Sequence, residues 1–471
     1  MLKASNIHYE MSERVGAINC GGIGAIHLMV QRTGLVEDLD KELHLLKVHL
    51  PYHESDHVLN VAYNLLAGGQ RLGDIELRRQ DEGFMNGLGA ERIPDPTTEG
   101  DFTRRFSPED ITVLQECINR ARLAVWKVQP ERFLKEAFVD VDGTIAGTYG
   151  ECKQGMDLSY KGIWGYAPLV VSLANTKEVL FVVNRRGNAP SQSGSVEWID
   201  RAVALVKQVA GSVTIRGDTD FSHTQQLDRW YGEGTQFILG IDAHPKLVGL
   251  AEALGKRAWK PFEREPKYEI LTEPRPKAFR YKEQVVVERE FENKKLVGEA
   301  LAEIEYRPHQ CRKTYRVIIL RKNISVQKGE RALFDEVRYF FYITNRKDKP
   351  EKIVGLANGR CDQENVIEQL KNGVNAMRMP VDNLVSNWAY MVMAALAWNL
   401  KAWYGLLVPN RERGSELVKM EFRRFLHTIL LLPCQIVRTA RRVIYRILGY
   451  NHWLPDFFAT WERLQRLVLV E

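Results

Sequence analysis

The chain has 471 residues, of which 45% are hydrophobic and 27% charged, a composition typical of a folded protein with roughly two to four structural units. Its net charge of +6 is too small to indicate a polyanionic partner, so such a partner must be inferred from local clusters of basic residues. The six cysteines are scattered and form no C-x-x-C pair, which argues against a structural zinc site and a disulfide framework.

The same features indicate where the protein works. Unpaired cysteines suit a reducing cytoplasm, and no segment near the N-terminus has the pattern of a signal peptide. The longest apolar runs, such as residues 388–400, are too short to span a bilayer. We therefore predict a cytoplasmic protein that does not insert into a membrane.

Residues 1–130 form the first predicted unit, and their pattern is mostly helical. In residues 57–79 the apolar side chains recur at helical spacing until Gly68 and Gly69 interrupt them, which suits the end of a helix.

The pattern changes to alternating strands and helices in residues 131–262. Strands are predicted at 137–147, 165–174, 178–186, 212–218 and 235–242, and helices at 195–210 and 222–232. Three strands in close succession followed by alternation predict an α/β fold, with a mixed sheet flanked by helices.

The second half of the chain is divided into three predicted units. Residues 263–345 are rich in β-strand patterns and charge and read as a domain inserted into the α/β unit, with strands at 284–291, 314–323 and 337–345. Residues 346–405 complete the α/β unit, and residues 406–471 are predicted to be helical and strongly basic.

Two predicted strands end in carboxylates. In "FVDVDGTIAG" (138–147), Asp140 and Asp142 point to the same face and Asp142 lies at the carboxyl end; in "VTIRGDTDFS" (213–222), Asp218 directly follows the strand. Either residue alone could be an ordinary turn residue or helix cap. As a pair on neighbouring strands, Asp142 and Asp218 would lie within reach of one cation. The first stretch also resembles the motif of haloacid-dehalogenase-type phosphatases, in which Asp140 would be the nucleophile.

A third charged motif lies in "GRCDQENVIEQLKNGVNAMRMP" (359–380). The spacing of Arg360, Glu364 and Lys371 predicts that all three lie on one face of a regular helix. A carboxylate between two cations suits a metal-and-phosphate site, in which Glu364 binds the metal and Arg360 and Lys371 bind phosphates. The alternative is a solvent-exposed helix with ordinary charge pairs.

Together these motifs resemble those of DDE transposases from bacterial insertion sequences, in the branch with a large β insertion before the glutamate helix. "YKGIWGYAPLVVSLANT" (160–176), "HVLNVAYNLLAGG" (57–69) and the extension of the glutamate helix strengthen the resemblance, which covers most of the chain in the family's order. One position departs: the family has a tyrosine three residues before the arginine, and here that residue is Ala357.

The resemblance implies a ribonuclease H-like core and a catalytic triad of Asp142, Asp218 and Glu364. These carboxylates would bind two Mg²⁺ ions, with Mn²⁺ as a possible substitute, and Arg360 and Lys371 would be the accessory cations. It further implies hydrolysis at the 3′ ends of an element and their transfer to target DNA, with double-stranded DNA and a second protomer as partners. Residues 1–130 would then bind DNA ends or mediate dimerisation. Two alternatives are a magnesium-dependent phosphatase that uses Asp140 and an inactive, transposase-derived DNA-binding protein.

DNA binding also requires basic residues outside the triad. Arg185 and Arg186 follow a predicted core strand and are placed to lie beside the substrate. A second group is predicted on the C-terminal helices, of which Arg441 and Arg442 are the leading DNA contacts.

Overall fold

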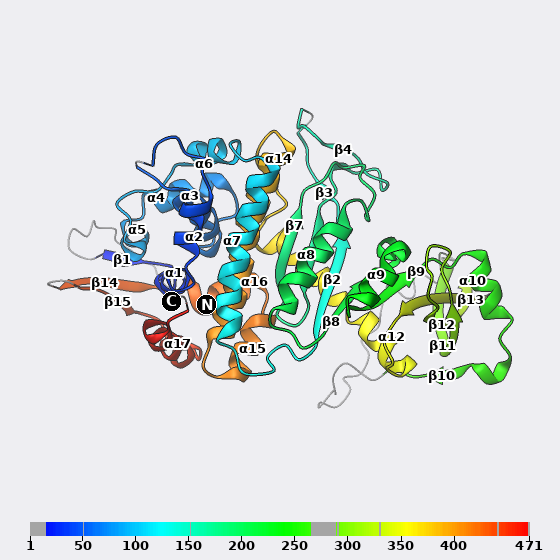
Figure 1. Ribbon diagram of the computed structural model, residues 1–471. Coiled ribbons are helices and arrows are strands. Elements are labelled where there is room, and N and C mark those ends of the chain that lie inside the picture. Colours follow the sequence, from blue (N-terminus) through cyan, green and yellow to red (C-terminus); the bar gives the residue numbers. More distant parts are fainter. Residues whose placement is uncertain are drawn as a thin grey trace.

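The computed structural model describes residues 16–49, 51–150, 152–264, 289, 292–328, 331–439 and 442–469. Helices gather at one end of the molecule, a mixed sheet lies in the middle, and long strands extend from the other end (Figure 1). Within the described residues, no helix combines the length and hydrophobicity needed to cross a membrane.

Five strands form the central part of the sheet, in the order β7-β6-β2-β8-β9. β2, β8 and β9 are parallel to one another, whereas β6 is antiparallel to β2 and β7 is antiparallel to β6. This is the mixed sheet that the ribonuclease H-like prediction requires, so the predicted fold class is confirmed. The bounds are β2 Ala137–Gly143, β6 Leu169–Leu173, β7 Glu178–Val183, β8 Val213–Gly217 and β9 Gln236–Ile241.

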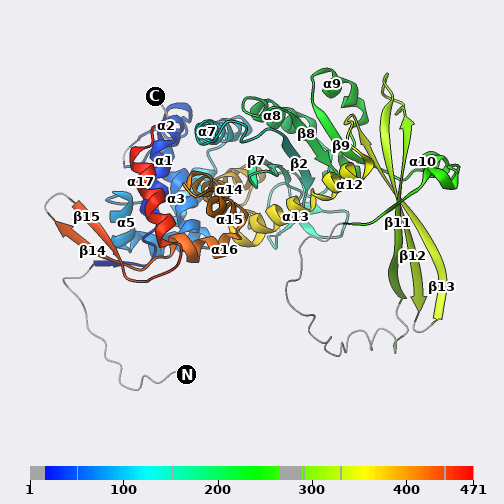
Figure 2. The ribbon, with the colours of Figure 1, turned by 90° about the horizontal axis from the view of Figure 1, so that it is seen from below.

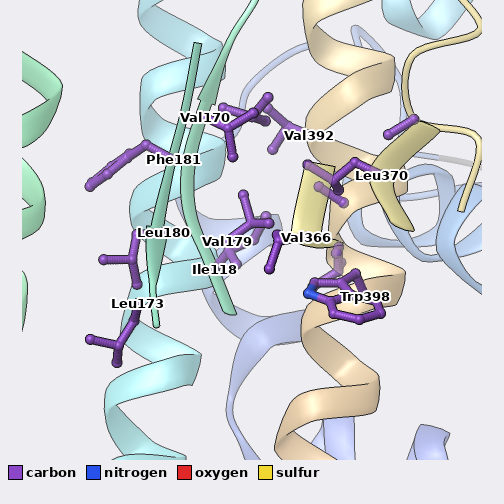
Figure 3. Close-up of a cluster of buried hydrophobic side chains, with 14 of the residues drawn as sticks. Ile118, Val170, Leu173, Val179, Leu180, Phe181, Val366, Leu370, Val392 and Trp398 are labelled. Carbon is purple, nitrogen blue, oxygen red and sulfur yellow. The ribbon is translucent and has the colours of Figure 1, made fainter. Parts of the chain in front are cut away.

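Helices cover both faces of this sheet, which is why every residue of β6, β7 and β8 is buried and why their sequences are mostly apolar. On one face, Phe181 of β7 contacts Trp198 of α8 (Ser195–Lys207). On the other, Val170 and Val179 point toward Val366 of α13 (Cys361–Glu368) and toward α14 (Leu384–Leu407), as Figure 3 shows.

A buried carboxylate joins the helical part to the sheet. Glu178, at the start of β7, accepts hydrogen bonds from Arg122 and Trp126 of α7 (Pro108–Lys127) and from Trp403 of α14, at 2.7 to 2.9 Å. Arg122 and Glu178 are both fully buried, so each charge depends on the other for compensation.

The N-terminal region is helical, as predicted. Helix α3 ends before Gly68, whose φ of +89° is a conformation that glycine adopts most readily. The helices before α7 are α1 Ile23–Arg32, α2 Leu35–Glu42, α3 Glu54–Leu66, α4 Ile75–Arg79, α5 Glu82–Leu88 and α6 Pro96–Thr103.

The C-terminal region differs from the prediction in one stretch. Helices α15 Arg411–Lys419, α16 Phe422–Phe425 and α17 Leu454–Arg466 agree with it. Between them, however, β14 (Cys434–Thr439) and β15 (Arg442–Ile447) form an antiparallel hairpin, and β14 also pairs with β1 (Gly16–Ile18). The prediction that the basic residues of this stretch, Arg442 among them, lie on helices was therefore wrong. The valines and isoleucines that lie between the arginines of this stretch favour a strand.

The β-rich segment is continuous with the catalytic sheet. Residues Phe341 to Thr344 of β13 pair with Ile238 to Ile241 of β9, so three long strands and a short one extend the sheet to nine strands. Their bounds are β10 Lys260–Phe262, β11 Glu292–Tyr306, β12 Tyr315–Lys328 and β13 Arg331–Thr344. The long strands and the β14–β15 hairpin lie at opposite ends of the molecule (Figure 2).

The predicted strands at 314–323 and 337–345 are thus confirmed and are longer than expected, whereas the one at 284–291 lies outside the described residues except for Arg289. The domain boundaries stay a prediction. The remaining elements are β3 Ala146–Gly147, β4 Asp157–Leu158, β5 Trp164–Tyr166, α9 Leu227–Gly232, α10 Pro245–Glu252 and α12 Pro350–Asn358.

Candidate active site

Asp142 and Asp218 lie at the same edge of the sheet. β2 and β8 are neighbouring parallel strands, and Asp142 is the next-to-last residue of β2. Asp218 directly follows β8, where its carboxylate accepts a hydrogen bond from the backbone N–H of Asp220 at 3.1 Å. The parallel pairing therefore brings together the two aspartates that the sequence singled out.

Arg360 connects these two carboxylates. Its Nη1 lies 3.0 Å from Oδ2 of Asp142, and its Nη2 lies 3.7 Å from Oδ2 of Asp218. Arg360 is the residue that precedes α13, and α13 packs against β6. A guanidinium group thus occupies the place between the aspartates where the sequence predicted a cation.

The electrostatics of the pair favour a bound cation. Burial raises the pKa of Asp142 to about 6, although the nearby Arg360 acts in the opposite direction. Burial also raises the pKa of Asp218, again against the effect of Arg360. Burial and mutual repulsion disfavour the charged forms of two neighbouring carboxylates, and a positive charge beside them offsets both effects. Their oxygen atoms are the ligands that Mg²⁺ prefers, so these residues fit such an ion.

Glu364 lies on the glutamate helix, α13, but its carboxylate is not beside those of Asp142 and Asp218. It is exposed, and it forms no ion pair with any described residue. The opposite side of α13 holds the helix in place: Gln363 donates a hydrogen bond to the carbonyl oxygen of Val170, and Val366 packs into the core (Figure 3). Among the described residues, no three carboxylate, histidine or cysteine side chains are close enough to bind one metal ion.

Lys371 does not continue the α-helix as predicted. Residues Gln369–Gly373 form a π-helical turn, so the regular spacing that would align Arg360, Glu364 and Lys371 is interrupted after Glu368. The prediction of a single regular helical face was therefore wrong. Arg360 faces the aspartates, Glu364 is exposed, and Lys371 lines a cavity together with Arg185.

The other predicted DNA-binding residues lie in different environments. Arg185 donates hydrogen bonds to the carbonyl oxygens of Ala167 and Ser191, whereas Arg186 is exposed. Arg442 is exposed on β15, far along the molecule from the aspartates (Figure 2), and Arg441 lies outside the described residues.

Asp140 is unsuited to be a nucleophile. It is fully buried, and both of its carboxylate oxygens accept hydrogen bonds from Arg216 of β8, at 2.6 and 2.7 Å. The Asp140–Arg216 pair joins the two strands that carry the aspartates. Sequence reasoning missed Arg216, although an arginine inside the apolar strand "VTIRGD" is a signal for a buried ion pair.

The position of the missing tyrosine, Ala357, shares an apolar cluster with another tyrosine. Ala357, in α12, packs against the same small apolar cluster as Tyr342 of β13. Burial raises the pKa of Tyr342, while the charges of Arg264 and Arg360 act in the opposite direction, so the phenol group lies within the electrostatic range of Arg360. This arrangement depends on the pairing of β13 with β9, which no local sequence pattern specifies.

Comparisons with known proteins place this geometry in a family. No curated protein matches the chain in sequence. Among solved structures, the chain is similar to the piggyBac transposase in a cryo-EM structure of its synaptic complex with hairpin DNA, with 10% identity, a TM-score of 0.41 and coverage of 88% of this chain and 84% of that one. The profile of the family described as "Transposase DDE domain group 1" matches residues 18–469, which is nearly the whole chain. The chain therefore belongs to the DDE transposases of group 1.

Proposed function

We propose that this transposase cuts the 3′ ends of an insertion sequence by hydrolysis and joins them to target DNA by transesterification. The observation that carries the proposal is the pair of aspartates at neighbouring strand ends, bridged by Arg360 from the helix that also bears Glu364. Two aspartates at one place, with Glu364 on the adjacent helix and arginine and lysine nearby, supply the residue types that phosphoryl transfer to water or to a 3′-hydroxyl group requires.

Each carboxylate of the proposed triad has its own place in the fold. Asp142 and Asp218 are held by the sheet, and Glu364 is held by a helix that packs on the sheet. Glu364 has no ion-pair partner among the described residues, so its carboxylate is free to bind a cation. Two Mg²⁺ ions, or Mn²⁺ in their place, would activate the attacking oxygen and stabilise the leaving oxygen when bound by these three residues.

Arg360 and Lys371 are the proposed phosphate contacts. Once the aspartates have another cation beside them, the guanidinium group of Arg360 is free to donate paired hydrogen bonds to phosphate oxygens. Lys371 would supply a point charge from the π-helical turn that follows α13. Both contacts would orient the bound DNA strand relative to the carboxylates.

Double-stranded DNA is the proposed substrate, both as the ends of the element and as the target. Two protomers would bring two element ends together, and we place this reaction in the cytoplasm, at the nucleoid. The exposed Arg186 and Arg442, together with Arg185 and Arg441, would contact the phosphate backbone. Light scattering of the protein mixed with a DNA end measures the mass of the complex. For the proposed dimer we expect the mass of two protomers and two DNA molecules.

A cleavage assay tests the proposed reaction. The substrate is a labelled duplex that carries the inverted repeat bordering the reading frame, and the proteins are wild type, Asp142→Asn and Asp218→Asn. We expect cleavage by the wild type only in Mg²⁺ or Mn²⁺, and DNA binding without cleavage by both variants. DNA binding by the wild type without cleavage in either metal would instead support an inactive DNA-binding protein.

The phosphatase alternative is tested with a different substrate and with variants of Asp140 and Glu364. It requires hydrolysis of a small phosphoester, such as p-nitrophenyl phosphate, that depends on Asp140 and persists in Glu364→Gln. Because both oxygens of Asp140 are bound to Arg216, we expect no such hydrolysis.

A further inference from the structure

A cavity of about 520 Å³ opens beside the end of β2. It lies between the residues that follow β2, the small sheet β3–β5–β4 and the loop after β7, and Lys371 reaches it from the glutamate helix. The polar residues in its lining include Thr144, Ser159, Lys161, Arg185, Ser191 and Lys371. Gly143, the neighbour of Asp142, also lines it, so the cavity adjoins the candidate active site without including the aspartates.

The charged residues that line this cavity are basic. Lys161, Arg185 and Lys371 line it, and among the residues that the structure describes no aspartate or glutamate does. Neither lysine has a carboxylate within 4.0 Å among the described residues. Burial lowers the pKa of Lys371, Glu368 on the same helical segment raises it, and the charge of Lys161 lowers it again against the weaker effect of Asp142. The two ammonium groups therefore lie close enough to repel each other.

Arg185 leaves one hydrogen-bond donor unused. Its Nε donates to the carbonyl oxygen of Ala167 at 2.8 Å, and its Nη1 donates to those of Ser191 and Ser193 at 2.7 and 2.8 Å. Its Nη2 is buried and has no hydrogen-bond partner among the described residues. Burial lowers the pKa of Arg185 to about 10, and none of the described carboxylates compensates the charge of its guanidinium group. A buried cation with an unused donor is stabilised when an anion binds beside it.

The walls of the cavity are closely packed. A Cβ atom at Gly165 of β5 would collide with the carbonyl oxygen of Ala146 in β3, and one at Gly187 would collide with the carbonyl oxygens of Gly165 and Asp157. These glycines let the loop after β7 and the small sheet meet through their backbones. Because this backbone frame is tightly packed and Arg185 is hydrogen-bonded to its carbonyl oxygens, the guanidinium group of Arg185 is held in place before any ligand arrives.

We propose that this cavity is a phosphate-binding subsite, formed by Lys161, Arg185 and Lys371, for a phosphodiester that flanks the reacting one on the bound DNA strand. The inference rests on the proposed function for the source of the phosphate, but the affinity for phosphate itself does not depend on cleavage. The subsite adds Lys161 and the small sheet to the DNA-binding surface, and it would fix the position of the strand relative to Asp142.

A thermal-shift titration of the whole chain with inorganic phosphate tests the subsite directly, with chloride at equal ionic strength as the reference. We expect phosphate to raise the melting temperature of the wild type, because a ligand that binds only the folded state stabilises it. Lys161→Gln, and more so Lys161→Gln with Lys371→Gln, should lose most of this rise. Lys256→Gln, which removes an exposed lysine outside the cavity, should keep it. Equal rises in all four proteins would overturn the proposal.

A second experiment identifies the DNA phosphate and separates this proposal from the proposed function. Binding of an end-bearing duplex is measured without divalent metal, with single methylphosphonate substitutions that remove one backbone charge at a time. We expect one position near the cleavage site whose substitution weakens binding by the wild type but not by Lys161→Gln. The slope of log affinity against log salt should also become less steep by about 0.9 in Lys161→Gln.

The outcomes of the two assays are distinguishable. If the wild type cleaves DNA, and Lys161→Gln has the same methylphosphonate profile and the same salt slope as the wild type, the subsite is refuted while the proposed function stands. If Lys161→Gln changes both the profile and the slope but the wild type does not cleave DNA, the subsite stands and the proposed reaction fails.

Discussion

Arg360 lies between Asp142 and Asp218, with its Nη1 3.0 Å from one carboxylate and its Nη2 3.7 Å from the other. A single guanidinium group therefore compensates two carboxylates whose burial disfavours their charged forms. Any metal ion that binds the aspartates must compete with this group or displace it. Because Arg360 is also a proposed phosphate contact, bound DNA would draw it away from the aspartates and favour metal binding.

Removing this guanidinium group should strengthen metal binding by the free protein. In Arg360→Gln, the aspartates lose their compensating charge, and we expect the Kd for Mn²⁺ in the absence of DNA to fall about tenfold, which corresponds to about 1.4 kcal/mol. Cleavage should be lost at the same time, because the phosphate contact is gone. Isothermal titration with Mn²⁺ measures the first effect without relying on activity.

Arg257→Gln is the matched control, since Arg257 is exposed and distant in sequence from both aspartates. Its affinity for Mn²⁺ should equal that of the wild type. Unchanged or weaker Mn²⁺ binding by Arg360→Gln would show that Arg360 does not compete with the metal.

The Asp140–Arg216 pair should contribute stability rather than chemistry. Asp140→Asn leaves Arg216 buried and uncompensated, so the free energy of unfolding should fall by about 3–5 kcal/mol. The double variant Asp140→Leu with Arg216→Met removes both charges and should be much less destabilised than the single variant. Urea unfolding measures both, and a single variant as stable as the wild type would contradict this account.

Glu178 should control how firmly the helices are attached to the sheet. Glu178→Gln leaves the buried Arg122 without a counter-charge, and we expect a loss of about 3–5 kcal/mol in the free energy of unfolding. Glu197→Gln is the control because Glu197 pairs with Arg201 on the exposed face of α8, where the loss should stay below about 0.5 kcal/mol. Similar urea midpoints for the two variants would contradict the role of Glu178.

Two arginines of the β14–β15 hairpin should differ in their contribution to DNA binding. Arg438 is already bound to Asn86 at 2.6 Å and to Glu82 at 3.2 Å, whereas Arg442 is exposed and has no ion-pair partner among the described residues. Arg442→Gln should therefore make the salt dependence of DNA binding less steep by about 0.9, and Arg438→Gln should change it less. Fluorescence anisotropy at several salt concentrations measures the slopes; equal slopes for both variants and the wild type would remove the hairpin from the DNA-binding surface.

Local patterns were enough to predict the parts of the site that sit at strand ends. An apolar run followed by Asp142 or Asp218 specifies a buried strand and the position of its carboxylate, and two such strands in alternation with helices pair in parallel. Arg360 was predicted near the phosphate site, but its contact with both aspartates depends on where α13 packs, which is decided by Val366 and Gln363 against β6.

Other features depend on contacts that sequence patterns do not carry. The π-helical turn at Gln369–Gly373 has no marker in the sequence, so the helical spacing predicted for Lys371 was wrong. The basic hairpin pairs with Gly16–Ile18 from the far end of the chain, a long-range contact that its own residues do not specify, and the spacing of its arginines by four residues also suits a helix. The pairing of β13 with β9, which makes one sheet of the core and the insertion, is likewise a long-range contact.

The most direct test of the central claim is whether Glu364 acts together with the two aspartates. Glu364→Gln and Glu368→Gln change two exposed carboxylates one turn apart on the same helix, so any general effect on the helix is shared by both. The measurement is cleavage of the end-bearing duplex in Mg²⁺ by both variants, with DNA affinity measured alongside. We predict that Glu364→Gln binds DNA but does not cut it, while Glu368→Gln cuts it as the wild type does. Normal cleavage by Glu364→Gln would contradict the triad and leave Asp142 and Asp218 without their third ligand.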